Sequence, residues 1–396
     1  MRWSKLIQKL FTVLAITILV LVSIEAVFRL TRGKDALNLS IGRRHAKYLT
    51  YLVPNSNLHL ISNKPGEYDV TAHINNFGFR GPDITNEKLP GQKRIFLIGD
   101  SFTFGVGAND DETIPYFLQQ KLDPSGEKIE VVNLGHGHNS PIIHYLRLKD
   151  EIPKFKPDLV VMLFDFSDLA DDWNFEKHAV FDKQHNLIAL NLYYENGKFS
   201  FWNFLRAHSV LCVYLHNKVV RTFWKIQKLG FAGYIKTRLE GKKAKAVIAG
   251  MKEDTIAYDA KLFLRGSEKA GEIKTHFPRT AKYILLSKEV AEVNGVRFAL
   301  VIYPYGIHVG TNQWSKGRID WGFAEGKLYT DMFSFKLVED FAKTNRIPFV
   351  NLLGPLRAHT DEMLYFSYDG HFTPAANKIA AEALAERISS EFLSEV

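Results

Sequence analysis

Residues 94–105, RIFLIGDSFTFG, combine a short apolar run with a polar turn that contains a serine. The apolar run, 94–99, ends in a glycine-bearing turn, and apolar residues at helical spacing follow at 113–122. A run that is apolar at successive positions is typical of a strand buried on both faces of a parallel sheet. Ser101 is therefore expected directly after a buried strand, where its hydroxyl is placed like an exposed nucleophile. Alone, Gly-Asp-Ser is also a common turn sequence.

Four further apolar runs extend this pattern along the chain. They lie at 130–133, 158–164, 297–303 and 347–352. Strands separated by helices predict an α/β domain, here a flavodoxin-like, three-layer parallel sheet covered on both faces. Ligands of such sheets bind beyond the carboxyl ends of the strands. The segments at those ends are therefore the candidate functional segments.

The spacing of the strands also predicts how the chain is divided. We expect an N-terminal anchor at 1–34, a connector at 35–90 that packs on the main domain, and the main domain at 91–396. The gap between the third and fourth strands is too long for one crossover, so it predicts a helical insertion at about 171–290.

Within the insertion, apolar residues that step by four predict a basic amphipathic helix: Leu211, Leu215, Val219 and Phe223. The stretch from Arg206 to Lys245 carries ten basic residues and one acidic, while the whole chain has a net charge of +8. Two interpretations stay open. The helix packs on the domain with a solvated charged face, or it contacts a membrane surface or an acidic glycan.

Residues 10–28 form an apolar run, LFTVLAITILVLVSIEAVF, preceded by Arg2, Lys5 and Lys9. At 1.5 Å per residue it spans about 28 Å, close to the thickness of a hydrocarbon core. We interpret it as an uncleaved single-pass anchor in the cell membrane; a cleaved signal peptide and a buried soluble helix are the alternatives. The flanking charges favour a cytoplasmic N-terminus and a main domain outside the cytoplasm, in the periplasm of a Gram-negative cell.

Composition narrows the function classes. Hydrophobic residues make up 46% and charged residues 24%, which is globular and excludes wholesale disorder. The single cysteine, Cys212, excludes an intramolecular disulfide and a cysteine-based metal cluster. No helix-turn-helix, zinc-finger or RNP-like pattern accompanies the positive charge, so we expect no nucleic-acid partner. We also expect no cofactor.

A second segment with candidate catalytic residues lies near the C-terminus, at YDGHFTP, 368–374. His371 precedes a helix that Pro374 begins and that is expected to run to about Phe392. A histidine can take the proton of a serine, while a carboxylate such as Asp369 fixes its tautomer. An Asp-x-His loop is ordinary by itself, but its position at the same sheet edge as Ser101 favours a pairing.

Together these segments resemble the SGNH/GDSL hydrolase family, in its membrane-anchored, cell-envelope type. GDSFTFG resembles the first block, which implies that Ser101 is the nucleophile. Asn133-Leu134-Gly135 resembles the second block, whose glycine N–H binds the oxyanion. YDGHFTP resembles the last block and implies that Asp369 and His371 complete the triad. The resemblance covers 91–170 and 297–396, and INNFGFRGPD (74–83) is similar to the lead-in of anchored members.

Two blocks depart from the family pattern. The third is usually Gly-x-Asn-Asp, but here it reads Asp165-Phe-Ser-Asp168, so Ser167 stands where the family has an oxyanion-binding Asn. The resemblance thus implies an oxyanion hole of Ser101, Gly135 and Ser167. Weaker activity, a different substrate, or a donor from elsewhere, such as Asn174, remain open. The last block has Asp-x-His instead of Asp-x-x-His.

Other polar residues near the strand ends have weaker patterns. We interpret His136, His138 and His144 as loop or substrate-lining residues, and a metal site is the less favoured alternative. The acidic residues Asp165, Asp168, Asp171 and Asp172 are expected in a solvated loop, with calcium as the alternative. Tyr303 lines an acyl or sugar site or simply covers the sheet. The candidate substrate contacts are Asp168, His138 and Tyr303, and no metal is expected.

The function predicted from these features is a membrane-anchored serine esterase or O-acyltransferase outside the cytoplasm. Its partners are the bilayer, through residues 10–28, and an acyl ester, with cell-envelope polysaccharide as the expected carrier. The alternatives are a catalytically weak or inactive protein that binds glycans or serves in assembly, and an esterase that acts on lipids.

Overall fold

The computed structural model describes residues 2–37, 43–45, 47–62, 64, 66–191, 194–195, 198–199 and 261–392, and the single positions 201, 209, 211, 218, 219, 222 and 226. The chain forms two compact units. One comprises 1–40 with 192–257, and the other, the main unit, comprises 41–191 with 258–396. Parts of the expected insertion at 171–290 thus belong to the main unit, which also includes most of the expected connector.

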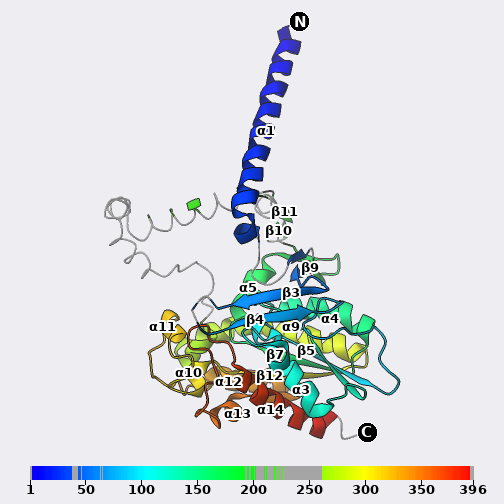
Figure 1. Ribbon diagram of the computed structural model, residues 1–396, viewed down its shortest axis with the longest axis vertical. Helices are drawn as coiled ribbons and strands as arrows, with labels where there is room; N and C mark the ends of the chain where they lie inside the picture. The colour runs from blue at the N-terminus through cyan, green and yellow to red at the C-terminus, as the bar shows by residue number, and fades with distance from the viewer. Residues whose placement is uncertain are drawn as a thin grey trace. The chain divides into compact units, whose positions relative to one another are not determined.

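The main unit is built on a five-stranded parallel sheet (Figure 1). Its strands are β5 (Lys93–Ile98), β6 (Ile129–Asn133), β7 (Leu159–Phe164), β12 (Arg297–Ile302) and β13 (Phe349–Asn351). They lie in the order β13-β12-β7-β5-β6, which is the flavodoxin-like order 2-1-3-4-5. The predicted fold class is confirmed. The order reverses beside β5, so the segments that follow β5 and β7 meet at the switch point, where such folds bind ligands.

Helices cover both faces of this sheet, as right-handed crossovers require. Three helices contact one another on one face: α3 (Ile114–Leu122), α13 (Leu353–Arg357) and α14 (Pro374–Phe392). Four others contact one another on the second face: α4 (Pro141–Phe155), α5 (Asp168–Glu176), α9 (Ala270–Val293) and α12 (Phe333–Thr344). All six residues of β7 are buried between them, which explains its continuous apolar sequence.

A β-hairpin precedes the sheet in the chain and packs over the turn that follows β5. It consists of β3 (Ser56–Ile61) and β4 (Asp69–Ile74), and exposed and buried residues alternate along β4. Buried Leu60, Ala72 and Ile74 form one apolar cluster with Phe104 and Val106. The hairpin therefore closes a small core of its own above the nucleophile segment.

Shorter elements complete the described chain. In the main unit they are β1 (Arg43–His45), β2 (Leu49–Tyr51), α2 (Ser101–Phe104), β8 (Ala179–Phe181), β9 (Leu187–Leu190), α10 (Gly306–Val309), α11 (Gly317–Asp320) and the 3₁₀ turns Asp110–Glu112 and Phe263–Lys269. The other unit contains β10 (Tyr194–Glu195) and β11 (Lys198–Phe199).

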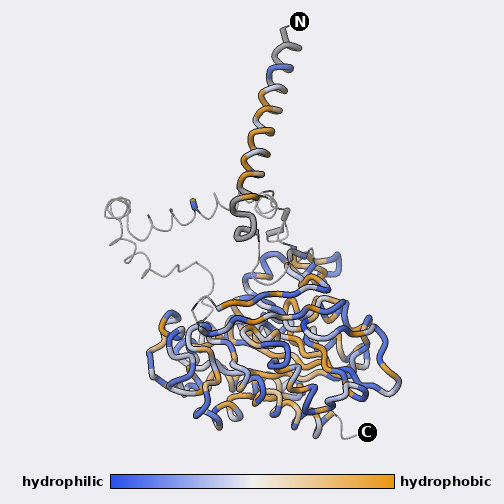
Figure 2. The backbone as a smooth tube through the Cα atoms, in the orientation of Figure 1, coloured by the Kyte–Doolittle hydropathy of each residue, from blue (hydrophilic) through white to orange (hydrophobic). Residues whose placement is uncertain are grey.

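The first unit contains one long helix, α1 (Arg2–Leu37), whose segment Ile7–Val27 is long and apolar enough to cross a membrane. Figure 2 shows the apolar residues along this helix, and Phe11 and Leu19 are among its exposed side chains. Glu25, near the end of the apolar run, accepts hydrogen bonds from the Ser209 hydroxyl at 2.7 Å and the Leu211 amide at 3.1 Å. Most of the predicted basic helix, including Leu215 and Phe223, lies outside the described residues.

Candidate active site

The candidate nucleophile lies on a tight turn between β5 and the short helix α2. Asp100 caps this helix, because its carboxylate accepts a hydrogen bond from the Phe102 amide at 2.9 Å. A Cβ atom at Gly135 would collide with the backbone of Thr103 and Phe104. Glycine is therefore required in the loop after β6, because that loop passes directly against the nucleophile turn.

Arg80 fixes the other end of the turn. Arg80 is 3% exposed, and its guanidinium donates to the carbonyl oxygens of Phe104, Gly105 and Ala108 at 3.1, 2.7 and 2.7 Å. Its Nε also pairs with Asp110 at 2.8 Å. Phe104 is the last residue of α2 and Gly105 is its C-cap, and carbonyls at a helix C-terminus have no partner within the helix. Arg80 belongs to the lead-in segment 74–83, so that segment supports the nucleophile turn.

Ser101, His371 and Asp369 form a continuous hydrogen-bonded chain. Ser101 Oγ lies 2.8 Å from His371 Nε2, and His371 Nδ1 is hydrogen-bonded to Asp369 Oδ1. The alternative acceptor of the serine, Asp100 Oδ2, is farther away at 3.4 Å. The structure thus brings the three residues together, although Ser101 and His371 are 270 positions apart in the sequence. The arrangement matches a serine, base and orienting carboxylate.

Electrostatics favour the charged forms of the acid and base. Burial raises the pKa of Asp369, but hydrogen bonds from His371 and Tyr68 outweigh it, so its pKa is lowered. Burial lowers the pKa of His371, but Asp369 and the nearby carboxylates of Asp100 and Asp165 outweigh it, so its pKa is raised above 6.5. Because only the neutral imidazole can accept the serine proton, the rate of a serine-dependent reaction should rise with pH through a value above 6.5.

Two residues that the sequence analysis did not identify hold Asp369 from the hairpin side. The Tyr68 hydroxyl donates to Asp369 Oδ2 at 3.0 Å. The Glu67 carboxylate accepts from the amides of Tyr368 and Asp369 at 2.6 and 3.2 Å. These contacts cross about 300 sequence positions. The local sequence at 68–74 alternates, which predicts a short strand but marks neither residue as part of a catalytic site.

Two of the three expected oxyanion donors, Gly135 and Ser167, have other partners in this structure. The Gly135 amide donates to Asn133 Oδ1 at 2.9 Å, and the Ser167 hydroxyl donates to Asp165 Oδ2. The alternative donor Asn174 accepts from Lys177 Nζ at 3.3 Å. The Ser101 amide is in the first turn of α2, where helix N–H groups have no acceptor within the helix.

The acidic residues after β7 are not a solvated loop, which corrects that expectation. Asp165 and Asp168 are each 1% exposed, and Asp172 is fully buried. Burial, and then the charge of Asp100, raises the pKa of Asp165 to about 7. Burial outweighs hydrogen bonds from Ser140 and Ile142 and raises the pKa of Asp172 to about 7. The local sequence predicted exposure to solvent, but α5, which carries Asp168 and Asp172, packs against α4 and α9, and Asp165 is hydrogen-bonded by Ser167 and Tyr305.

The three candidate substrate contacts lie in different environments. Tyr303 is fully buried and donates to Asp100 at 2.8 Å, so it supports the nucleophile turn instead of facing a substrate. Asp168 is buried and accepts from the Asp165 amide at 3.0 Å, which does not fit a direct substrate contact either. His138 is exposed, in the loop after β6, with a φ of +62°.

Two histidines near the site, His136 and His144, are buried and uncharged. Burial first, and then Arg147, lowers the pKa of His136 to about 4 and that of His144 to about 3. Within the described part of the chain, no group of three or more His, Cys, Asp or Glu side chains is arranged to hold a metal ion.

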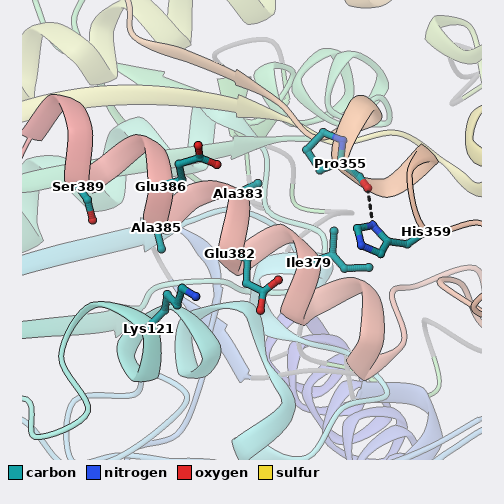
Figure 3. Close-up of a pocket in the computed structure, with 9 residues that line it drawn as sticks. All are labelled: Lys121, Pro355, His359, Ile379, Glu382, Ala383, Ala385, Glu386 and Ser389. Carbon is teal, nitrogen blue, oxygen red and sulfur yellow. Dashed lines mark hydrogen bonds between the residues drawn. The ribbon is translucent and has the colours of Figure 1, made fainter.

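A separate pocket of about 540 Å³ lies between α3, α13 and α14 and contains none of the triad residues (Figure 3). Figure 3 shows that the carboxylates of Glu382 and Glu386 point in different directions, and that His359 is hydrogen-bonded to the Pro355 carbonyl, at 3.0 Å. These side chains do not converge on one ligand position, so we assign no function to this pocket.

Comparison with known proteins finds similarity to solved structures of hydrolases. One is an acetyl xylan esterase, AlAXEase, with 13% identity and a TM-score of 0.36, covering 74% of this chain and 99% of that chain. Another is a catalytic mutant of the acetylxylan esterase Axe2 from Geobacillus stearothermophilus, with 13% identity and a TM-score of 0.36, covering 76% and 96%. A third is a proposed lipolytic protein of the G-D-S-L family from Desulfitobacterium hafniense DCB-2, with 13% identity and a TM-score of 0.36, covering 75% and 99%.

No family model and no curated protein matches the sequence. At this identity and TM-score, the likeness to solved structures carries no argument about activity. We therefore infer the function from this chain's own residues.

Proposed function

We propose that this chain is a serine esterase of the SGNH/GDSL hydrolase type, with Ser101, His371 and Asp369 as its catalytic triad. The observation that carries the proposal is the unbroken hydrogen-bonded chain from Ser101 Oγ through both ring nitrogens of His371 to Asp369. The sequence motifs that resemble the family lie at the ends of β5, β6 and the C-terminal loop, which is the edge where an α/β sheet binds ligands.

The geometry supports nucleophilic attack on an ester. Ser101 Oγ attacks the carbonyl carbon while His371 Nε2 takes its proton, and Asp369 stabilises the resulting imidazolium. The tetrahedral intermediate collapses as the imidazolium protonates the leaving alkoxide, which leaves an acyl-serine. Water, or a sugar hydroxyl in the transferase variant, then attacks the acyl group with His371 as base, and Ser101 is regenerated.

We place this reaction outside the cytoplasm, at a membrane. The support is Ile7–Val27, a helical segment with large apolar side chains exposed, which is unfavourable for a helix in water. The preceding basic residues Lys5 and Lys9 favour a cytoplasmic N-terminus. We propose acyl esters of cell-envelope polysaccharides as the substrates, because the sequence resembles hydrolases of the cell-envelope type, with lipid esters as the alternative.

A catalytically weak, glycan-binding protein is the second candidate function, and one observation favours it. The Gly135 amide and the Ser167 hydroxyl both donate to groups within the protein, Asn133 and Asp165. Each missing oxyanion donor typically lowers the rate by about 10²–10³-fold. A protein with an assembled triad and occupied donors could thus bind an ester and turn it over slowly.

The test is labelling of the full-length protein, in detergent micelles, with a fluorophosphonate probe. The probe reacts only with an activated serine, and mass spectrometry locates the adduct. We expect labelling at Ser101 that is absent in Ser101→Ala and at least 10²-fold slower in His371→Ala, because the proton acceptor is lost. Ser125→Ala, an exposed serine away from the triad, is the matched control.

If the wild-type protein is folded, as shown by an intact thermal transition, but is not labelled, the esterase hypothesis is rejected. The glycan-binding function then remains. Once labelling is established, hydrolysis of acetylated oligosaccharides and of p-nitrophenyl esters of increasing chain length separates glycan esters from lipid esters. Release of free acetate versus its appearance on an added sugar acceptor separates hydrolysis from transfer.

A further inference from the structure

We infer that Tyr68 and Glu67, in the hairpin that precedes the sheet, are positioning residues for the acid arm of the triad. The inference rests on the proposed function of Ser101, His371 and Asp369. Both residues lie outside the segments that resemble the hydrolase family, at 91–170 and 297–396. The main sheet alone therefore does not complete the site.

The two residues hold Asp369 in different ways. Tyr68 donates its hydroxyl to Asp369 Oδ2 at 3.0 Å, while Oδ1 is hydrogen-bonded to His371. With both oxygens engaged, the carboxylate cannot rotate without losing a charge-assisted hydrogen bond. Glu67 accepts from the backbone amides of Tyr368 and Asp369 at 2.6 and 3.2 Å and so fixes the loop itself.

Packing fixes Tyr68 in turn. Its ring lies 5.1 Å from that of Phe366, and a Cβ atom at Gly107 would collide with both rings. Glu67 is oriented by the Ser62 hydroxyl, which donates to it at 3.0 Å. The acid loop is thus held between the hairpin and the turn that follows α2. Such support holds a catalytic group in its reactive geometry, where a displacement of about 1 Å can cost 10²-fold in rate.

The contact also affects the charge of the acid. The Tyr68 hydrogen bond is one of the interactions that lower the pKa of Asp369, after the bonds from His371. In the reverse direction, burial and the charge of Asp369 raise the pKa of the Tyr68 phenol, so it remains a donor at neutral pH. The charged groups that face His371 are Asp369, Asp100 and Asp165, and Tyr68 reaches the imidazole only through Asp369.

The experiment uses Tyr68→Phe, which keeps the ring against Phe366 and removes only the hydroxyl. We expect the fluorophosphonate reaction of full-length protein, and kcat for p-nitrophenyl acetate, to fall about tenfold with KM unchanged, as for the loss of one hydrogen bond to a charged group. We also expect the ascending limb of the pH–rate profile to move to higher pH. A carboxylate that loses its second donor is more basic and holds the proton of His371 more firmly.

Two variants of Glu67 should lower the rate to different degrees. Glu67→Gln keeps a side-chain oxygen for one of the two amides, whereas Glu67→Ala keeps none, so the loss of rate should be larger in the alanine variant. Tyr116→Phe, on the exposed side of α3, is the matched control for removal of a phenol hydroxyl. Thermal melting identifies any variant that has lost its fold.

The outcomes separate this inference from the proposed function. A wild-type protein that labels at Ser101, together with a Tyr68→Phe variant of equal rate and unchanged pH profile, would overturn the positioning role and leave the esterase intact. A wild-type protein that does not label would overturn the esterase itself, and the inference with it. A tenfold loss with the pH limb displaced supports the positioning role, because a merely structural defect would not move the limb.

Discussion

The two sides of Ser101 are built differently. On the acid–base side, every group of the triad has the partner that catalysis needs, and the hairpin holds Asp369 through Tyr68 and Glu67. On the oxyanion side, Gly135 and Ser167 have partners that catalysis does not need, namely Asn133 and Asp165. The structure therefore has a prepared nucleophile next to donors that are satisfied internally. We therefore expect the oxyanion side, and not the triad, to limit the rate.

The largest effect should come from the acid–base side, in Asp369→Asn. The amide has the same size but lacks the charge and favours the wrong histidine tautomer, so we expect the fluorophosphonate rate to fall roughly 10³–10⁴-fold. Loss of the carboxylate also removes the main cause of the raised pKa of His371, so the ascending limb of the pH–rate profile should move to lower pH. The measurement is the labelling rate between pH 5 and 9.

If Asp369→Asn reacted at nearly the wild-type rate, the carboxylate would have no catalytic role. The statement that the acid–base side has the partners that catalysis needs would then be wrong. Asp361→Asn, an exposed aspartate upstream in the same C-terminal region, is the matched control.

A smaller change, of opposite sign, should come from the oxyanion side. Ser167→Asn restores the amide of the family's third block, and we expect kcat for p-nitrophenyl acetate to rise about tenfold, part of the 10²–10³-fold that one donor contributes. Ser167→Ala should change kcat by less than about threefold, because the hydroxyl it removes already donates to Asp165. A large loss in Ser167→Ala would show instead that the hydroxyl turns toward the oxyanion during reaction.

The smallest effect concerns stability on the oxyanion side. The pKa of Asp172 is raised to about 7, against 3.8 for the unperturbed group. The folded protein thus binds this proton more tightly than the unfolded chain, and stability falls as pH rises from about 4 to 7. Asn does not titrate and its oxygen can still accept from Ser140 and Ile142. The melting temperature of Asp172→Asn relative to wild type should therefore improve by roughly 3 °C between pH 5 and pH 8.

Other titrating groups are common to both proteins and cancel in this difference. Asp340→Asn, at an exposed position on α12, is the control and should show no such trend. An equal difference in melting temperature at both pH values would mean that Asp172 is ionised throughout, or that water reaches it.

The strands of the sheet could be predicted from the sequence because their apolar runs are continuous, and the three central strands, β5, β7 and β12, are almost wholly buried. The runs 94–99, 130–133 and 158–164 became Lys93–Ile98, Ile129–Asn133 and Leu159–Phe164. The final helix begins at Pro374, as expected, and ends at Phe392. The edge of the sheet followed from the same logic, and with it the meeting of Ser101 and His371.

The parts that could not be predicted depend on contacts between distant segments. Charged residues are usually exposed, but Asp165 is buried against Ser167 and Tyr305, and Asp172 is buried on α5, which packs against α4 and α9. Tyr68 approaches Asp369 across 301 positions, and nothing local marks its hydroxyl as a partner for an acid. Tyr303 directly follows β12, is fully buried and donates to Asp100, so of the two interpretations that its sequence left open the structure favours a residue that covers the sheet.

The anchoring of Arg80 has a practical consequence for where this protein can be cut. A fragment that starts at residue 91, where the resemblance to hydrolases begins, would lose the guanidinium that binds the carbonyls of Phe104, Gly105 and Ala108. It would also uncover Phe104 and Val106, which now pack on the hairpin. A fragment for crystallisation should therefore begin no later than Ile41, the first residue of the main unit.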